Sequence, residues 1–303
     1  MQNPSQLYRF ETDTDPRDVR ATVLLVALGG FIDAGGAQRL MTDHLLRSLD
    51  HTVVASFDLD QMFDYRGRRP VMTFDRDRWS AYADPSLLLH RVIDTDGQPF
   101  LVLTGPEPDY QWERFVEAVR ELIGILGVTL TVSVNGIPMA VPHTRPIGIT
   151  AHASDPRLVV EREPIFGTVQ VPASVTGLLE LRLAESGNDA VGFAIHVPHY
   201  LAQADFADAA VAALGTFTGA TGLGIPDAEL VAAAGLNRAE IAKEVAGSDE
   251  VASVVEALER QYDTYVEGHA RPSLLATDVS ELPSAEEIGA EFEQFLRNQS
   301  DEG

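Results

Sequence analysis

The sequence predicts an α/β protein with a three-layer α/β/α domain, in which helices cover both faces of a mostly parallel or mixed sheet. Up to about residue 222, apolar runs of strand length alternate with segments whose apolar residues recur at helical spacing. From residue 225 onward, only the helical pattern continues. We therefore expect an α/β/α domain over residues 1–224 and a helical C-terminal extension over residues 225–303.

Two strands and a helix open the predicted domain. Residues 21–30 read ATVLLVALGG, a run of apolar and β-branched residues closed by two glycines, which is typical of a buried strand ending in a tight turn. Residues 51–60 are the next expected strand, and a basic loop, DYRGRRP, follows it. The helix between the two strands has an apolar face made of Ala37, Leu40, Met41 and Leu45.

The rest of the domain alternates in the same way. Over residues 71–103 we expect a hairpin system, in which LLLHRVID and PFLVLTG are joined by DTDGQP with its Asp-Gly turn signal. Helices are then expected from about residue 110 and over 171–186 and 204–219, and strands over 128–138, 157–163 and 190–197.

The expected extension carries a long helical stripe of apolar residues between Val251 and Val266. Further on, Ser284 and Glu287 form a capping box, which indicates the start of another helix. The apolar face of that helix would consist of Ile288, Phe292, Phe295 and Leu296.

Composition excludes several chemistries. The chain has no cysteine, so disulfides, thiolate nucleophiles and cysteine-ligated metal clusters are excluded. Lys243 is the single lysine, which disfavours Schiff-base chemistry and a lysine-dependent phosphate loop. The N-terminal residues do not have the pattern of a signal peptide, and no apolar run is long enough to span a bilayer, so we expect a cytoplasmic protein.

The formal charge of −24 argues against nucleic acid or a membrane as partner, because both carry negative charge. Residues 227–303 contain 18 acidic and 5 basic side chains and thus hold more than half of this excess. Solvated helix faces account for such a run, and an acidic docking surface is the alternative.

Four segments follow predicted strands and have unusual turn chemistry: GGFIDAGG, GPEPDYQW, NGIPMAVPHTRP and HVPHY. Ligands of open α/β sheets bind where parallel strands end, so these segments are expected to form the rim of a pocket. The candidate residues are Gly29, Gly30, Asp33, Glu107, Asp109, Asn135, His143, Arg145, His196, His199 and Tyr200.

Each segment also has a structural interpretation. GGFIDAGG presents backbone amides to an anion or forms a tight turn between strand and helix. Glu107 and Asp109 are a carboxylate pair for acid–base chemistry or the acidic start of a helix. His143 and Arg145 are a base beside an anion clamp or part of a loop whose path the prolines fix.

Metal, cofactor and serine-hydrolase sites are not expected. Pro198 lies between His196 and His199 and prevents a helix from placing both rings on one face, and the other histidines have no ligand spacing. There is no G-x-S-x-G motif, and Ser133 in SVNG lacks that elbow. We assign no cofactor.

Four motifs in order, VALGGFIDAGGAQRL, TGPEPDYQW, NGIPMAVPHTRPIGITAH and AIHVPHYLAQADF, resemble the proteasome assembly chaperone 2 family, in its longer actinobacterial branch. The resemblance covers roughly residues 20–225 and implies a phosphorylase/hydrolase-like α/β/α fold, a homo-oligomer, with a trimer favoured, and a loose link to proteasome assembly. It supplies no catalytic residues. Docking through a C-terminal hydrophobic–Tyr–any tail is not expected, since the sequence ends in NQSDEG.

Two functions follow from these observations. The first is a non-enzymatic, self-associating protein that holds protein partners through apolar surface, as an assembly chaperone does. The second is an enzyme or small-ligand-binding protein that uses the strand-end pocket for a nucleoside, a peptide or another polar metabolite. The first needs a large apolar interface, and the second needs a concave site where the candidate side chains converge.

Overall fold

A mixed sheet of eight strands forms the centre of the computed structural model, which describes residues 3–159 and 167–268. The strand order is β1-β3-β6-β7-β2-β8-β10-β9. The strands are β1 (Tyr8–Phe10), β2 (Val23–Gly29), β3 (His51–Phe57), β6 (Leu88–Ile93), β7 (Pro99–Pro106), β8 (Leu130–Met139), β9 (Ile149–Ala153) and β10 (Asp189–Pro198).

The four central strands, β7, β2, β8 and β10, run parallel to one another. Antiparallel strands flank them, with β6, β3 and β1 on one side and β9 on the other. Gly29 of β2 is paired with Pro106 of β7, and Pro198 of β10 with Met139 of β8. The carboxyl ends of the parallel strands therefore lie at a common edge.

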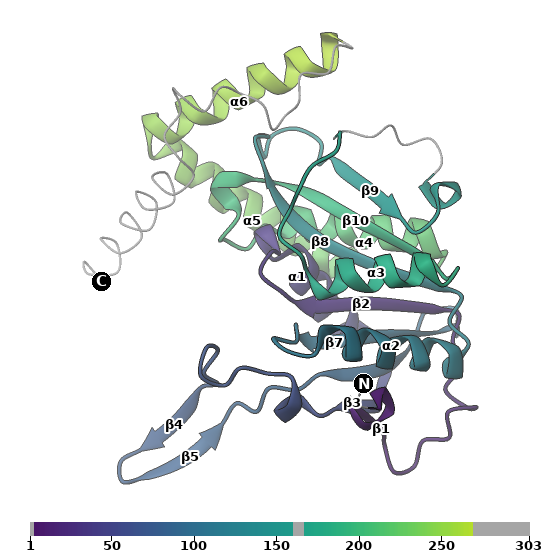
Figure 1. Ribbon diagram of the computed structural model, residues 1–303. Coiled ribbons are helices and arrows are strands. Elements are labelled where there is room, and N and C mark those ends of the chain that lie inside the picture. The colour runs from purple at the N-terminus through teal and green to yellow at the C-terminus, as the bar shows by residue number, and fades with distance from the viewer. Residues whose placement is uncertain (1–2, 160–166, 269–303) are drawn as a thin grey trace.

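Helices cover both faces of the sheet, which confirms the predicted three-layer fold (Figure 1). One face carries α2 (Trp112–Leu126) and α3 (Val175–Glu185), and the other carries α1 (Ala37–Ser48) and α4 (Ala207–Thr221). The helix α5 (Ala228–Ala246) packs on α4, and α6 (Asp249–Gly268) follows it. None of the helices in the described ranges is long and apolar enough to cross a membrane.

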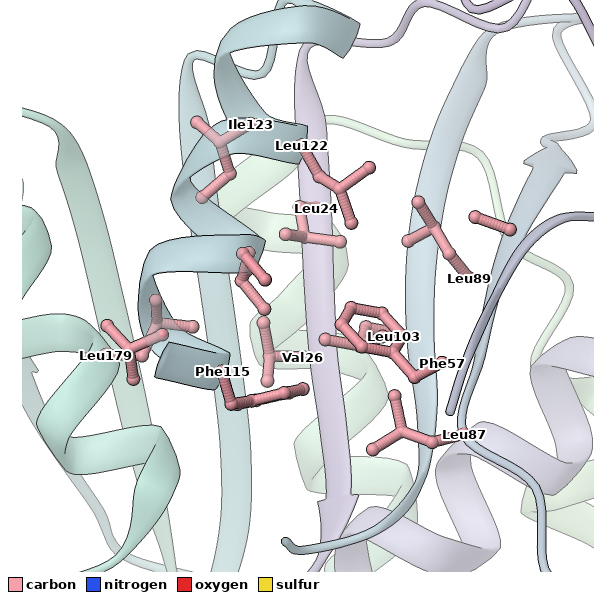
Figure 2. Packing of buried hydrophobic residues seen from close by; sticks show 14 of the residues in the cluster. Leu24, Val26, Phe57, Leu87, Leu89, Leu103, Phe115, Leu122, Ile123 and Leu179 are labelled. Carbon is pink, nitrogen blue, oxygen red and sulfur yellow. The ribbon is translucent and has the colours of Figure 1, made fainter. Parts of the chain in front are cut away.

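Two apolar cores lie on the two faces of the sheet. Leu24 and Val26 of β2 point toward α2, where Phe115 and Leu122 pack against them (Figure 2). The alternate residues of the same strand belong to the core under α1 and α4. Since β2 is buried on both faces, its sequence is a continuous apolar run instead of an alternating one.

The predicted strand over 157–163 is wrong for the residues that the structure describes. Pro156–Val159 form a 3-10 turn, because the carboxylate of Asp155 accepts the backbone N–H of Arg157 and closes a local turn. The strand that pairs with β10 is instead β9, which the sequence analysis did not predict. The predicted capping box at Ser284 and Glu287 lies outside the described residues.

A separate two-stranded hairpin projects from the body of the molecule between β3 and β6 (Figure 1). Its strands are β4 (Met72–Asp75) and β5 (Arg78–Tyr82), and every residue in them is exposed. The predicted hairpin system is confirmed for β6 and β7, and β4 and β5 form an additional hairpin within the same range.

Candidate functional site

The four segments that follow the central strands are brought to one edge of the sheet. Their strands are parallel neighbours, as the strand-end argument requires. The backbone N–H of Glu107 donates to the carbonyl of Gly29 at 3.1 Å and ties the first two segments together. The polar side chains at this edge nevertheless form separate clusters, each with its own internal partners.

Asp33 holds the turn between β2 and α1. Its Oδ1 accepts the backbone N–H of Gln38 at 2.9 Å and that of Gly136 at 3.1 Å, and its Oδ2 accepts the N–H of Arg39 at 3.0 Å. Two of these amides belong to the first turn of α1, so the carboxylate stabilises the start of that helix. A Cβ on Gly136 would lie 2.0 Å from the carbonyl oxygen of Ala34, so loop and strand are in direct backbone contact.

Glu107 and Asp109 hold different elements. Oε1 of Glu107 accepts the backbone N–H of Val175 at the start of α3, at 2.6 Å. Oδ2 of Asp109 accepts the backbone N–H of Asp64 and an N–H of Arg68, both at 2.6 Å. The two carboxylates therefore bind different parts of the chain and do not form the pair that acid–base chemistry would need.

His143 and Tyr200 form a hydrogen-bonded pair between the loop after β8 and the end of β10. The Tyr200 hydroxyl oxygen accepts the His143 backbone N–H at 2.9 Å and lies 2.7 Å from Nδ1 of the ring. These two contacts tie the loop after β8 to the turn after β10. Burial lowers the pKa of His143, against the opposing effect of Glu259 and Asp208, and burial raises the pKa of Tyr200 to about 12.

Arg145 lies two residues further along and binds α6. Its guanidinium donates to both carboxylate oxygens of Asp263, at 2.8 and 2.7 Å, and lies 3.3 Å from Glu259. Bonding to Arg145 holds the pKa of Asp263 below its usual range. Thr144 also donates to Glu259, and the Tyr262 hydroxyl donates to the Pro146 carbonyl oxygen at 3.4 Å. The predicted anion clamp is thus occupied by the protein's own helix.

His196 lies inside the sheet, away from the rim. Its side chain is 2% exposed, and Nε2 lies 2.8 Å from the hydroxyl oxygen of Thr150 on β9. Burial lowers its pKa to about 4. The ring fills the space left by Gly148, where a Cβ would come 2.5 Å from Nδ1.

The remaining candidate residues have varied environments. His199 is partly buried in the 3-10 turn after β10, and its ring packs edge-on against Tyr200 with centroids 5.6 Å apart. Burial lowers the pKa of His199. Asn135 is half-buried on β8 opposite Ala194. Gly30 is exposed beside Glu107.

Comparison with protein families gives a match over residues 27–245, which is most of the chain. The chain belongs to the PAC2 family. The resemblance drawn from the four motifs is thereby confirmed. A comparison with curated proteins gives no match.

Solved structures of actinobacterial PAC2 relatives are similar over most of the chain. The protein of unknown function Rv2714 from Mycobacterium tuberculosis is 46% identical, with a TM-score of 0.82 over 87% of this chain and 91% of its own. A protein of unknown function from Corynebacterium glutamicum is 35% identical, with a TM-score of 0.82 over 88% of this chain and 100% of its own. The M. tuberculosis proteasome-assembly chaperone homologue Rv2125, at 24% identity, shares the fold, with a TM-score of 0.71 over 77% and 100%.

Three residues that bind the candidate residues of this PAC2 chain were not predicted from the sequence. Glu259 and Asp263 are far from Arg145 in sequence, and Arg68 comes from the basic loop after β3. One signal was available, because Glu259 and Asp263 are four residues apart and so share one face of a helix. Nothing in the sequence indicated that this face meets the loop after β8.

Two small cavities lie in the core of the PAC2 fold, one under α2 beside Leu24 and Val119, and one under α3 beside Thr131 and Leu179. Over residues 3–159 and 167–268, no three His, Asp or Glu side chains are arranged to hold a metal ion.

Proposed function

We propose that this PAC2 protein is a self-associating protein-interaction protein of the assembly-chaperone kind and not an enzyme. The observation that carries the proposal is the apolar surface of the projecting hairpin. Phe74 is 56% exposed, Trp79 is 63% exposed, and Val71, Met72 and Tyr82 are exposed beside them. Contiguous exposed apolar groups on a soluble chain mark an interaction site.

The strand-end residues support the same function, because their side chains bind other groups of the same chain. Asp33, Glu107, Asp109 and Arg145 all form hydrogen bonds or ion pairs within the chain. A ligand site would need several of these groups free to converge on a common point. The alternative, an enzyme or small-ligand-binding protein, therefore has less support from the geometry.

The family gives the kind of partner. One structural neighbour is described as a proteasome-assembly chaperone homologue, and a more distant one, PbaB from Pyrococcus furiosus, as an archaeal proteasome activator. We extend from these only the class of activity, which is the binding of protein to protein. The expected assembly is a homo-oligomer, with a trimer favoured.

The mass of the purified chain in solution tests the proposal. Sedimentation velocity at micromolar concentration should give a species of three times the 32.8 kDa chain mass. A chain that stays monomeric throughout the micromolar range would contradict self-association.

A thermal-shift screen against nucleosides, amino acids, short peptides and divalent metals tests the alternative. We expect no saturable shift. A shift that His143→Ala abolishes would favour the pocket over the interaction surface.

A further inference from the structure

The helix α5 has an exposed apolar face. Twelve of its 19 residues are Ala, Val, Leu or Ile, yet only three of these are buried. Leu236 is 72% exposed and Val231 is 42% exposed. We call the side of α5 that carries them the outer face, and its exposed residues are Val231, Ala232, Gly235, Leu236 and Ala239. A helix that is apolar on all sides is normally buried, so the outer face needs a covering that residues 3–159 and 167–268 do not provide.

A second apolar helix face is encoded further along the sequence, in residues 284–297, which we call the tail segment. The capping box of Ser284 and Glu287 marks the start of its predicted helix. The apolar residues from Ile288 to Leu296 follow at i, i+4, i+7 and i+8, which is one side of that helix. A helix of about 14 residues is marginal in water on its own, so it needs a surface on which this side can pack.

The tail segment and the outer face of α5 are complementary in size and in charge. The outer face is built mostly from small side chains, and the tail segment offers the large rings of Phe292 and Phe295, so the two helices can approach closely. The tail segment contains four glutamates and one arginine, a net charge of −3. Lys243 is exposed on the same side of α5, four residues beyond Ala239, and offers these glutamates a positive charge.

Residues 269–283 are long enough to bring the tail segment back to α5. Fifteen extended residues span at most about 50 Å. The helix α6, which has 20 residues, is about 30 Å long and packs on α5 (Figure 1). A connection of this length gives an effective concentration in the millimolar range, far above the micromolar concentration of the chain in solution. Contact within one chain is therefore favoured over contact between copies.

We infer that the tail segment docks as a helix on the outer face of α5 in the same chain. This inference does not rest on the proposed self-association, because both surfaces belong to one chain. While the tail segment is docked, the outer face of α5 is closed to other proteins. A protein partner that binds there has to displace the tail segment first.

Amide hydrogen exchange of the full chain, measured by mass spectrometry, tests the contact. An undocked segment of this length exchanges at nearly the rate of an unfolded peptide, and we expect docking to slow exchange in the tail segment about 30-fold. Leu236→Asp places a charge on the outer face and should return the tail segment to about the unfolded rate. Leu181→Asp on α3 is the matched control, because Leu181 is also an exposed leucine in a helix, and it should leave the slow exchange unchanged. Exchange in β2 checks that each variant is folded.

A mixture of two variants separates contact within a chain from contact between copies. The Leu236→Asp chain keeps an intact tail segment, and the chain with Phe292→Asp and Phe295→Asp keeps an intact outer face. The two tail segments differ in mass, so each is followed separately. We expect the tail segment of the Leu236→Asp chain to exchange as fast in an equimolar micromolar mixture as it does alone. Slow exchange in the mixture would show that it docks on a second copy and would overturn the inference.

Two further results would also overturn the inference. Fast exchange of the tail segment in the unmodified chain would show that it does not dock at all. Equally slow exchange in the unmodified and Leu236→Asp chains would place it on another surface. These measurements do not depend on the mass of the protein in solution, so their failure leaves the proposed self-association standing, and a monomeric chain leaves this contact standing.

Discussion

The buried imidazole of His196 is a single group whose protonation opposes folding. Burial lowers its pKa to about 4, while the unfolded chain has a histidine pKa near 6.5. As pH falls through this interval, the unfolded chain binds the proton first, and stability is lost. We expect the free energy of unfolding to fall by about 2 kcal/mol between pH 7 and pH 5 because of this residue.

Urea unfolding of the unmodified chain and of His196→Asn over this pH range measures the effect. The variant should have the smaller pH dependence, since it has no imidazole to charge. His152→Asn is the control, because His152 is exposed on β9 and paired with Glu180. Equal pH dependence in the unmodified chain and His196→Asn would contradict this role.

Gly136 is a second residue on which the strand-end edge depends. Its missing side chain lets the Ala34 carbonyl approach β8, so Gly136→Ala forces two backbones apart. We expect a loss of about 3 kcal/mol in the free energy of unfolding. Gly124→Ala in the middle of α2, where a Cβ meets nothing, should instead add about 0.5–1 kcal/mol. Equal effects of the two substitutions on the melting temperature would refute this explanation.

The sequence could predict which segments meet at this edge but not what their side chains bind. Turn chemistry after an apolar run locates Asp33 and His143 at strand ends, because the parallel order of the sheet requires it. The carboxylates that bind Arg145 come from more than 100 residues away, and no local pattern encodes that distance. The same limit applies to Thr150, which binds His196 from a strand that the sequence analysis did not predict.

Among the elements, burial on both faces decided which were predictable. The strands β2 and β10 are buried almost without interruption, and α2 has a clear apolar stripe. The strands β4, β5 and β9 are short and have little or no burial, so their residues follow no period that distinguishes strand from loop. Only the structure identifies them, through the pairing of β9 with β10 and of β4 with β5.

The attachment of α6 to the loop after β8 is an interaction between elements that can be tested. Arg145 binds Asp263 with both oxygens and also contacts Glu259, but these side chains are partly exposed, so the pair contributes only about 1 kcal/mol. Arg145→Gln should therefore speed amide hydrogen exchange in α6 about fivefold and leave the sheet unchanged. Arg260→Gln removes an exposed arginine of α6 whose partner is Glu256 and serves as the control. Unchanged exchange in α6 of Arg145→Gln would show that other contacts hold the helix.

At the scale of the whole molecule, copies of a chain with a charge of −24 repel one another, and association needs a local surface of opposite sign. The projecting hairpin and the arginine-rich segment before it, residues 66–82, are the candidate for this surface, because they contain five arginines and two aspartates, a net charge of +3. Arg76→Glu with Arg78→Glu changes their net charge from +3 to −1, so their field no longer attracts an acidic neighbour. We expect the dissociation constant of the oligomer to rise at least tenfold, or about 1.4 kcal/mol, in 0.1 M salt.

Arg17→Glu with Arg20→Glu changes the total charge by the same amount at two exposed positions outside residues 66–82, so it measures the general repulsion alone. Sedimentation velocity of both double variants separates the two effects. A larger effect for Arg76→Glu with Arg78→Glu means that the position of the charge controls association, because total charge is identical in the two chains. Equal effects would mean that repulsion between whole molecules is sufficient, and that the arginines of residues 66–82 have no specific partner.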